Sequence, residues 1–323
     1  MTDKIVLLAF DEVHACLPSQ WGNEQMREEM YTAPSYLKAQ VSTTTRAPVL
    51  AMSASVKVKT NKRKGKSEIE EIKTMCSIAH SPTTVITISP ILSNHIYVSV
   101  KKPPTKNGFF GKDCFSFKPD KVGTVHVLWQ LYLKRFVEDI LAGETPKRAV
   151  LFVKKMTDLM EVDDFLTSKL GHLDISRDPN TCPWVTNSSA TGKITAEKIR
   201  ARSTTANSSI HLYITTSVML FGLDLKDVSI VILMSPFNSL NSFLQAGGRA
   251  GRRQGDGYRK KAVVYTLYNG TDIRRNSPME ESVRNFHDER SCLKQKVAML
   301  FSPKQQKNEI NNTDWCCSFC SLK

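Results

Sequence analysis

The 323-residue sequence has no apolar run of the roughly 18 residues that a membrane span requires. Its N-terminal apolar segment, residues 5–10, is too short for a secretory signal peptide. An acidic pair follows that segment, where a signal peptide would have the small residues of a cleavage site. The sequence therefore predicts a soluble, intracellular protein.

Acidic residues are scarce relative to basic ones. The chain has 31 Asp and Glu against 45 Lys and Arg, so its formal net charge is +14. Such an excess favours a polyanionic partner, for which nucleic acid is the leading candidate, although a generic basic surface is the alternative. With 41% hydrophobic and 24% charged residues the composition is globular, which excludes wholesale disorder. The length suggests two domains of ordinary size.

Cysteines are distributed unevenly. Four of the eight are scattered singly, and the other four lie close to the C-terminus: Cys292, Cys316, Cys317 and Cys320. In a reducing compartment a cluster of this kind favours a metal site over disulfides. The alternative is a set of free thiols in a frayed tail.

Strand and helix patterns alternate along the chain. Short apolar runs predict strands at residues 5–10, 49–52, 85–88, 95–100, 149–153, 210–215, 228–234 and 262–267. Helical spacing predicts helices at residues 68–79, 125–141, 158–170 and 195–202, with Gly171 as a C-terminal stop. Residues 101–104, Lys-Lys-Pro-Pro, are typical of a linker. This alternation predicts an α/β fold with parallel sheets.

Two adjacent carboxylates follow the first predicted strand, in the sequence Asp11-Glu12-Val13-His14. Function in open α/β sheets gathers at the carboxyl ends of strands. Asp11 can hold Mg²⁺ through water, and Glu12 can orient the water that attacks a γ-phosphate. His14 can relay the state of the nucleotide to neighbouring elements. The alternative is a surface acidic pair, but the apolar strand in front favours an NTPase.

The next residues, Ser19-Gln20-Trp21-Gly22, make the chain resemble the RecQ family of superfamily 2 DNA helicases. In that family a loop of this sequence follows the acidic box and senses single-stranded DNA. The resemblance implies that Gln20, Trp21 and Arg27 bind nucleic acid, with Trp21 offering a stacking face. Downstream the sequence departs from the family, because residues 23–27 lack its His and its aromatic residue, and Arg27 is an approximate match.

A second block resembles motifs V and VI of the same superfamily. Its segments are Thr215-Thr216-Ser217, Phe221-Gly222-Leu223-Asp224 and Gln245-Ala246-Gly247-Gly248-Arg249-Ala250-Gly251-Arg252. The resemblance implies that Thr215 contacts nucleic acid and that Gly222, Asp224, Gln245 and Gly248 line the nucleotide cleft. Arg249 and Arg252 are expected on one helical face, from which their guanidinium groups stabilise charge on the γ-phosphoryl group. The alternative is a basic helix terminus on a solvated face.

Two further features fit this resemblance. Residues 51–55, Ala-Met-Ser-Ala-Ser, are similar to the family's third motif, which links the ATP site to DNA movement, although an ordinary turn is the alternative. RecQ-like proteins also carry a zinc module near the position of the clustered cysteines. The resemblance implies a Zn²⁺ site formed by Cys292, Cys316, Cys317 and Cys320.

A Gly-rich loop ending in Gly-Lys-Ser/Thr is expected upstream of the acidic box, where only ten residues are present. Gly65-Lys66-Ser67 follows the third motif and no strand precedes it, so we interpret it as a surface loop. We therefore expect half of a RecA-like helicase domain at residues 1–100. A complete second RecA-like domain follows at 101–275, and the start of a zinc module at 276–323.

Two functions remain open. One is a fragment of an ATP-dependent 3′–5′ DNA helicase that uses ATP, Mg²⁺ and Zn²⁺, acts on single strands and duplex junctions, and resides in the nucleus. The other is a non-catalytic nucleic-acid-binding protein. An RNA helicase of the same superfamily is disfavoured by residues 19–22. Because of the missing loop, we expect this chain alone to show no DNA-stimulated ATPase activity.

Overall fold

The computed structural model describes residues 7–10, 28–42, 48–53, 67–78, 95–101, 127–173, 182–187, 209–216, 225, 227–251, 261–270, 272–274, 279–287, 292–293 and 317. The chain divides into two compact units. The first contains residues 1–91 and 294–313, and the second contains residues 92–293 and 314–323. The predicted domain boundaries at residues 100 and 275 stay predictions.

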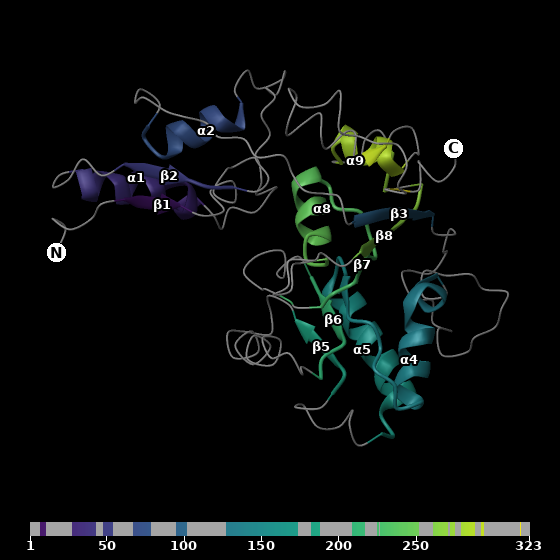
Figure 1. Ribbon diagram of the computed structural model, residues 1–323. Coiled ribbons are helices and arrows are strands. Elements are labelled where there is room, and N and C mark those ends of the chain that lie inside the picture. The colour runs from purple at the N-terminus through teal and green to yellow at the C-terminus, as the bar shows by residue number, and fades with distance from the viewer. Residues whose placement is uncertain are drawn as a thin grey trace. The chain divides into compact units, whose positions relative to one another are not determined.

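The first unit contains a pair of parallel strands and two helices (Figure 1). Strand β1 (Leu8–Phe10) pairs in parallel with β2 (Val49–Ala51), as the two apolar runs predict. The helices are α1 (Glu28–Ser42) and α2 (Glu68–Met75). Residues of α2 and its C-terminal turn pack against both strands and form a small core of Ile72, Met75 and Cys76 with Phe10, Val49, Ala51 and Ile78.

Helix α2 begins at its predicted residue and ends before its predicted end. The Oγ atom of Ser67 accepts a hydrogen bond from the Glu70 N–H at 3.2 Å, and the Ser67 N–H donates to Oε2 of Glu70 at 2.8 Å. This capping box satisfies two N–H groups that the first turn leaves without helical partners. The prediction of helix to residue 79 was wrong, because Ser77 adopts a φ of 53°, which a right-handed helix cannot continue.

The second unit is built on a six-stranded sheet in which all neighbouring strands are parallel. Its strands in chain order are β3 (His95–Lys101), β4 (Ala149–Phe152), β5 (Trp184–Asn187), β6 (Leu212–Thr215), β7 (Ile230–Leu233) and β8 (Ala262–Tyr268). Their order across the sheet is β3-β8-β7-β4-β6-β5. Every residue of β4 and β6 is buried, which explains why these strands are continuous apolar runs. The predicted parallel α/β fold is confirmed.

One face of this sheet is covered by two helices. They are α4 (Lys134–Leu141), which continues the π-helical turn η5 (Trp129–Leu133), and α5 (Met156–Leu170). Phe136 and Phe165 from these helices share a core with Leu151 and Ile214 of the sheet. Helix α5 ends at Gly171, as predicted, and the glycine keeps a right-handed conformation there.

The opposite face carries helix α8 (Leu240–Gly247) and is joined by α9 (Glu281–His287). Successive residues of β8 point to opposite faces of the sheet. Tyr265 packs against the core beneath α4 and α5, whereas its neighbour Val264 lies beside Gly247 of α8, so α8 lies on the other face. Phe243 of α8 contacts Phe286 of α9, with ring centroids 5.7 Å apart. Among the described helices, none combines the length and the apolar character that a membrane span needs.

Four of the described elements were not predicted: α1, β5, α8 and α9. Strand β5 is anchored to α5, because the indole N–H of Trp184 donates to Oδ1 of Asp163 at 2.7 Å. Strand β3 was predicted, but within the first domain. The structure pairs all seven of its residues with β8, so it is an edge strand of the second unit's sheet.

Candidate functional site

The two strands of the first unit end side by side. Phe10 pairs with Ala51, and the N–H of Met52 donates to the Phe10 carbonyl at 2.8 Å. The acidic box follows Phe10 in sequence, and the third motif spans Ala51 to Ser55. The parallel register therefore brings the ends of the strands that lead into both motifs to one edge of the sheet.

The acidic and DNA-sensing residues themselves lie outside the described residues. These are Asp11, Glu12, His14, Gln20, Trp21 and Arg27. In the second unit, Gly222, Asp224, Arg252, Cys316 and Cys320 also lie outside them, as does the predicted helix at 195–202. The roles assigned to these residues stay predictions.

Thr215 ends strand β6, at the carboxyl edge of the large sheet. It pairs with Phe152 at the end of β4, and Phe152 pairs with Leu233 at the end of β7. The Thr215 side chain is fully buried, and its Oγ1 donates to the Thr216 carbonyl at 3.0 Å. Contact between this hydroxyl and nucleic acid would therefore require the end of β6 to open.

Helix α8 presents the glycine- and arginine-rich motif. The side chain of Ser239 caps its start by accepting from the Ser242 N–H at 3.1 Å, and Phe243 and Ala246 face the core. Arg249 was expected on a helical face that it shares with residue 252, and residue 252 lies outside the described residues. Helix α8 ends at Gly247, and Arg249 lies in the turn that follows.

The physical reason is the glycine content of the motif. Gly251 has a φ of +64°, a left-handed conformation that glycine adopts without steric cost, so the chain turns away from the helix axis. A Cβ atom on Gly247 would lie 3.0 Å from the Tyr97 hydroxyl oxygen, so a glycine there lets α8 approach β3 closely. These glycines thus shape the end of the helix and its contact with the sheet.

Arg249 is only 7% exposed. Its Nε donates to the carbonyl oxygen of Gln245 at 3.4 Å, which turns the side chain back along the end of α8. Gln245 itself is half-buried, and Gly248 caps the helix by donating its N–H to the Leu244 carbonyl at 2.8 Å. The structure therefore brings Gln245, Gly248 and Arg249 together at one helix end.

The turn that carries Arg249 is fastened to the sheet at two points. The Nε2 atom of His95, the first residue of β3, lies 3.0 Å from the Ala250 carbonyl oxygen and donates to it. The Gly251 N–H donates to the Val228 carbonyl at 2.9 Å. Sequence reasoning missed His95 because 155 residues separate it from Ala250 and no local motif marks it.

Two of the four clustered cysteines are described, and they lie together. Cys292 and Cys317 are both buried, with their Sγ atoms 3.9 Å apart. Cys317 also forms an isolated parallel bridge with Tyr97 of β3. Within the described ranges, no set of three or more His, Cys, Asp or Glu residues is close enough to hold a metal ion.

Comparison with known proteins identifies the class of the second unit. Residues 133–254 match the model of the helicase conserved C-terminal domain, a segment that contains α4 through α8 and both motif-like regions. This segment is therefore similar to helicase C-terminal domains, and its sheet has the parallel α/β fold of RecA-like domains. No curated protein sequence matches the chain.

Two solved structures show the same fold at low sequence identity. The Mycobacterium smegmatis helicase Lhr bound to single-stranded DNA and AMP-PNP has a TM-score of 0.54 at 18% identity, with 84% of this chain and 30% of that chain covered. The DUF1998 helicase MrfA bound to DNA has a TM-score of 0.56 at 14% identity, with 84% and 31% covered. The chain thus spans about a third of the length of these helicases.

Proposed function

We propose that the chain is part of the motor of a RecQ-like, ATP-dependent 3′–5′ DNA helicase. The observation that carries this proposal is the helicase C-terminal domain match over residues 133–254. That segment includes Arg249 and Arg252 of the last motif. The RecQ-like loop at residues 19–22 favours DNA over RNA as the substrate, and a DNA substrate favours a nuclear location.

In the proposed mechanism the motif residues have separate roles in ATP hydrolysis. Asp11 would hold Mg²⁺ and Glu12 would orient the attacking water, while Arg249 and Arg252 would stabilise the transferring phosphoryl group. Transfer of the γ-phosphoryl group of bound ATP to water would supply the free energy that drives the motor.

The nucleotide and the DNA strand would contact different residues. Gly222, Asp224, Gln245 and Gly248 would line the nucleotide cleft, and Gln20, Trp21, Arg27 and Thr215 would contact the strand. The net charge of +14 favours binding of a phosphate backbone.

We also propose a structural Zn²⁺ site formed by Cys292, Cys316, Cys317 and Cys320. Zinc–thiolate bonds of about 2.3 Å in a tetrahedron place two sulfur atoms about 3.8 Å apart. The Sγ atoms of Cys292 and Cys317 lie 3.9 Å apart, so this pair fits two corners of such a site. A bound Zn²⁺ would cross-link Cys317 to Cys292, which follows α9 in the sequence.

DNA-stimulated ATP hydrolysis tests the proposed function. It should be measured for this chain and for the complete reading frame that encodes it, with single-stranded DNA and with RNA. We expect turnover only where an in-frame Gly-Lys-Ser/Thr loop is present, and stimulation by DNA rather than RNA. Arg249→Ala should abolish that turnover, whereas Arg135→Ala, which removes an exposed arginine of α4, should preserve it.

The second candidate function is nucleic-acid binding without catalysis, which the net charge of +14 favours. The same assay separates the two candidates. A complete reading frame that binds DNA but hydrolyses no ATP would establish the second function and refute the first.

A further inference from the structure

A hollow of about 740 Å³ lies at the amino edge of the large sheet. Four of its lining residues each stand directly before a strand: Lys261 before β8, Ser229 before β7, Arg148 before β4 and His211 before β6. Because these four strands are consecutive neighbours in the sheet, the four residues form one row along its edge. The row arises only when the parallel strands assemble.

The hollow is strongly basic. Arg148 and Lys261 of the row, together with Lys147, place three permanent positive charges around it, and both lysines are exposed. The lining contains one carboxylate, that of Asp227, which lies 3.8 Å from Nη1 of Arg148. The excess of positive charge favours an anionic ligand.

His211 adds a polar atom without a partner. Its Nδ1 atom is buried and has no hydrogen-bond partner among the described residues. The ring also makes a hydrogen bond to the backbone of Pro146, which has only a carbonyl to offer, so Nε2 is the donor there. Burial and the nearby Arg148 guanidinium lower the pKa of His211. A bound anion would oppose this shift, because a nearby negative charge favours the protonated ring.

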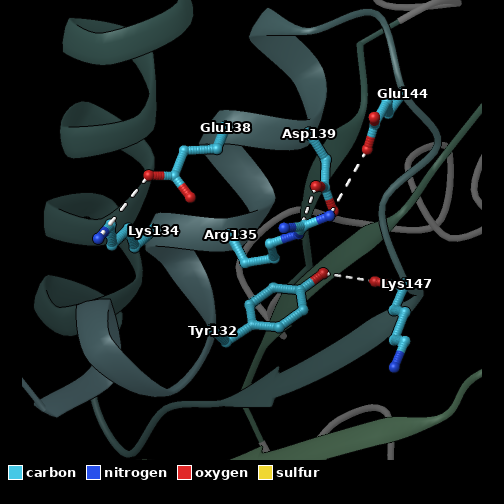
Figure 2. Close-up of polar contacts among 7 residues, drawn as sticks. All are labelled: Tyr132, Lys134, Arg135, Glu138, Asp139, Glu144 and Lys147. Carbon is cyan, nitrogen blue, oxygen red and sulfur yellow. Dashed lines mark hydrogen bonds and ion pairs between the residues drawn. The ribbon is translucent and has the colours of Figure 1, made fainter.

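The segment that carries Lys147 is held in place by side chains of η5 and α4 (Figure 2). The Tyr132 hydroxyl donates to the Lys147 carbonyl at 2.7 Å, so the backbone of Lys147 is held while its ammonium extends away from the Tyr132 ring. Arg135 forms ion pairs with Asp139 at 2.6 Å and with Glu144 at 3.6 Å, which attach the start of the segment to the helix. The backbone that carries the positively charged side chains is therefore held in a defined position.

The rest of the row is held by backbone hydrogen bonds. The Ala149 N–H donates to the His211 carbonyl at 2.8 Å, and the Ser229 N–H donates to the Arg148 carbonyl at 3.0 Å. The Val263 N–H donates to the Ser229 carbonyl at 2.9 Å. A ligand would thus meet a preorganised set of donors, which lowers the entropic cost of binding.

We propose that this hollow binds a phosphate group, held by Lys147, Arg148 and Lys261, with the His211 ring beside them in the lining. Pro146, Ile230, Val263 and Tyr265 form an apolar wall beside it for the part of the ligand that carries the phosphate. The site lies at the opposite edge of the sheet from Thr215. It does not depend on the proposed helicase function, because phosphate binding can be measured without ATP hydrolysis.

NMR titration of the full chain with inorganic pyrophosphate tests the site, with the backbone amides of Ser229 and Val263 as reporters. We expect saturable shifts at these amides. Lys147→Gln and Lys261→Gln remove exposed charges and should each weaken binding about three- to tenfold, the loss expected for one solvent-exposed hydrogen bond. Lys134→Gln makes the same charge change on α4, outside the hollow, and should leave the affinity unchanged.

The pH dependence of binding tests the role of His211. Sulfate suits this measurement because its charge stays constant near neutral pH. Its affinity should rise as the pH falls from about 7.5 to about 5.5, and this rise should be smaller in His211→Gln. The other titratable and charged groups that face the hollow are Lys147, Arg148, Asp227, Lys261 and Tyr265, and the variant retains all of them.

A parallel titration with a single-stranded oligonucleotide identifies the source of the phosphate. If Lys147→Gln and Lys261→Gln weaken both pyrophosphate and the oligonucleotide, the phosphate belongs to a strand. If they weaken only pyrophosphate, it belongs to a small ligand. Absence of saturable shifts at Ser229 and Val263, or an equal loss of affinity in Lys134→Gln, would overturn the proposal.

Discussion

The Nδ1 atom of His287 lies 2.8 Å from Oγ of Ser99, although 188 residues separate them in sequence. His287 is fully buried at the end of α9 and packs against the rings of Phe243, Tyr268 and Phe286. Its Nε2 has no hydrogen-bond partner among the described residues. Burial lowers the pKa of this imidazole to about 3, so α9 is attached to β3 through a neutral histidine.

The first prediction concerns the pH dependence of stability. The folded-state pKa of His287 is about 3 against an ordinary value of 6.5, so on acidification the unfolded chain takes up this proton first. The contribution of neutral His287 to the free energy of unfolding is complete above pH 6.5. It is lost between pH 6.5 and about 3, at up to about 1.4 kcal/mol per pH unit. Urea unfolding at several pH values should show this slope in the wild type, and His287→Gln should reduce it. Identical slopes in the two proteins would contradict the prediction.

The second prediction concerns the close contact between α8 and β3. Gly247→Ala places a Cβ atom 3.0 Å from the Tyr97 hydroxyl oxygen and 3.2 Å from a ring carbon. Both groups are buried, so we expect the variant to lose about 1–3 kcal/mol in the free energy of unfolding. Gly270→Ala is the matched control, since nothing lies within 4 Å of its new Cβ and its φ is not positive. Equal stability of both variants would show that α8 can shift freely on the sheet.

The third prediction tests the capping box of α2. Ser67→Ala removes the acceptor for the Glu70 N–H and should destabilise the helix by about 1 kcal/mol. Amide hydrogen exchange along residues 68–75 reports this loss locally. Thr74→Ala removes an exposed hydroxyl near the other end of the same helix and should leave exchange unchanged or slower, because alanine is the better helix former. Faster exchange in Thr74→Ala than in Ser67→Ala would refute the role of the cap.

The fourth prediction concerns the cysteine pair. If Cys292 and Cys317 belong to a zinc site, purified protein should contain about one Zn²⁺ per chain, and chelation should lower its thermal stability. Cys317→Ser should abolish the zinc content. Cys182→Ser, which alters a half-buried cysteine beside the core of α4 and α5, should retain it. Protein that carries no zinc as purified, and takes none up, would exclude this site.

Several elements could be predicted because local sequence dominates them. Strands β4 and β6 are buried on both faces, so their residues are continuously apolar and their positions were predicted to within two residues. Helix α1 was missed because Pro34 lies inside it, and a proline usually breaks a helical pattern. Strand β5 was missed because Trp184–Asn187 is short and owes its place to β6 and to the Trp184–Asp163 hydrogen bond.

The candidate site was also predicted only in part. The glycine- and arginine-rich motif could be recognised from sequence, and the structure places Gln245, Gly248 and Arg249 at one helix end. Sequence reasoning expected a helical face at Arg249, because it could not anticipate that α8 ends at Gly247 or that the Ala250 carbonyl contacts His95. Both are consequences of how the turn meets the sheet.

The sequence by itself determined the parallel α/β class, the strongest strands and the helicase-like motifs, because these depend on apolar periodicity and on residues close together in the chain. Tertiary structure alone decided three further features: the place of β3 beside β8, the burial of His287 against Ser99, and the row formed by Lys261, Ser229, Arg148 and His211. The first and the third depend on parallel pairing between strands that are far apart in the chain, and the second depends on the packing of α9 against β3. Strand order, which no local pattern encodes, therefore created the basic hollow.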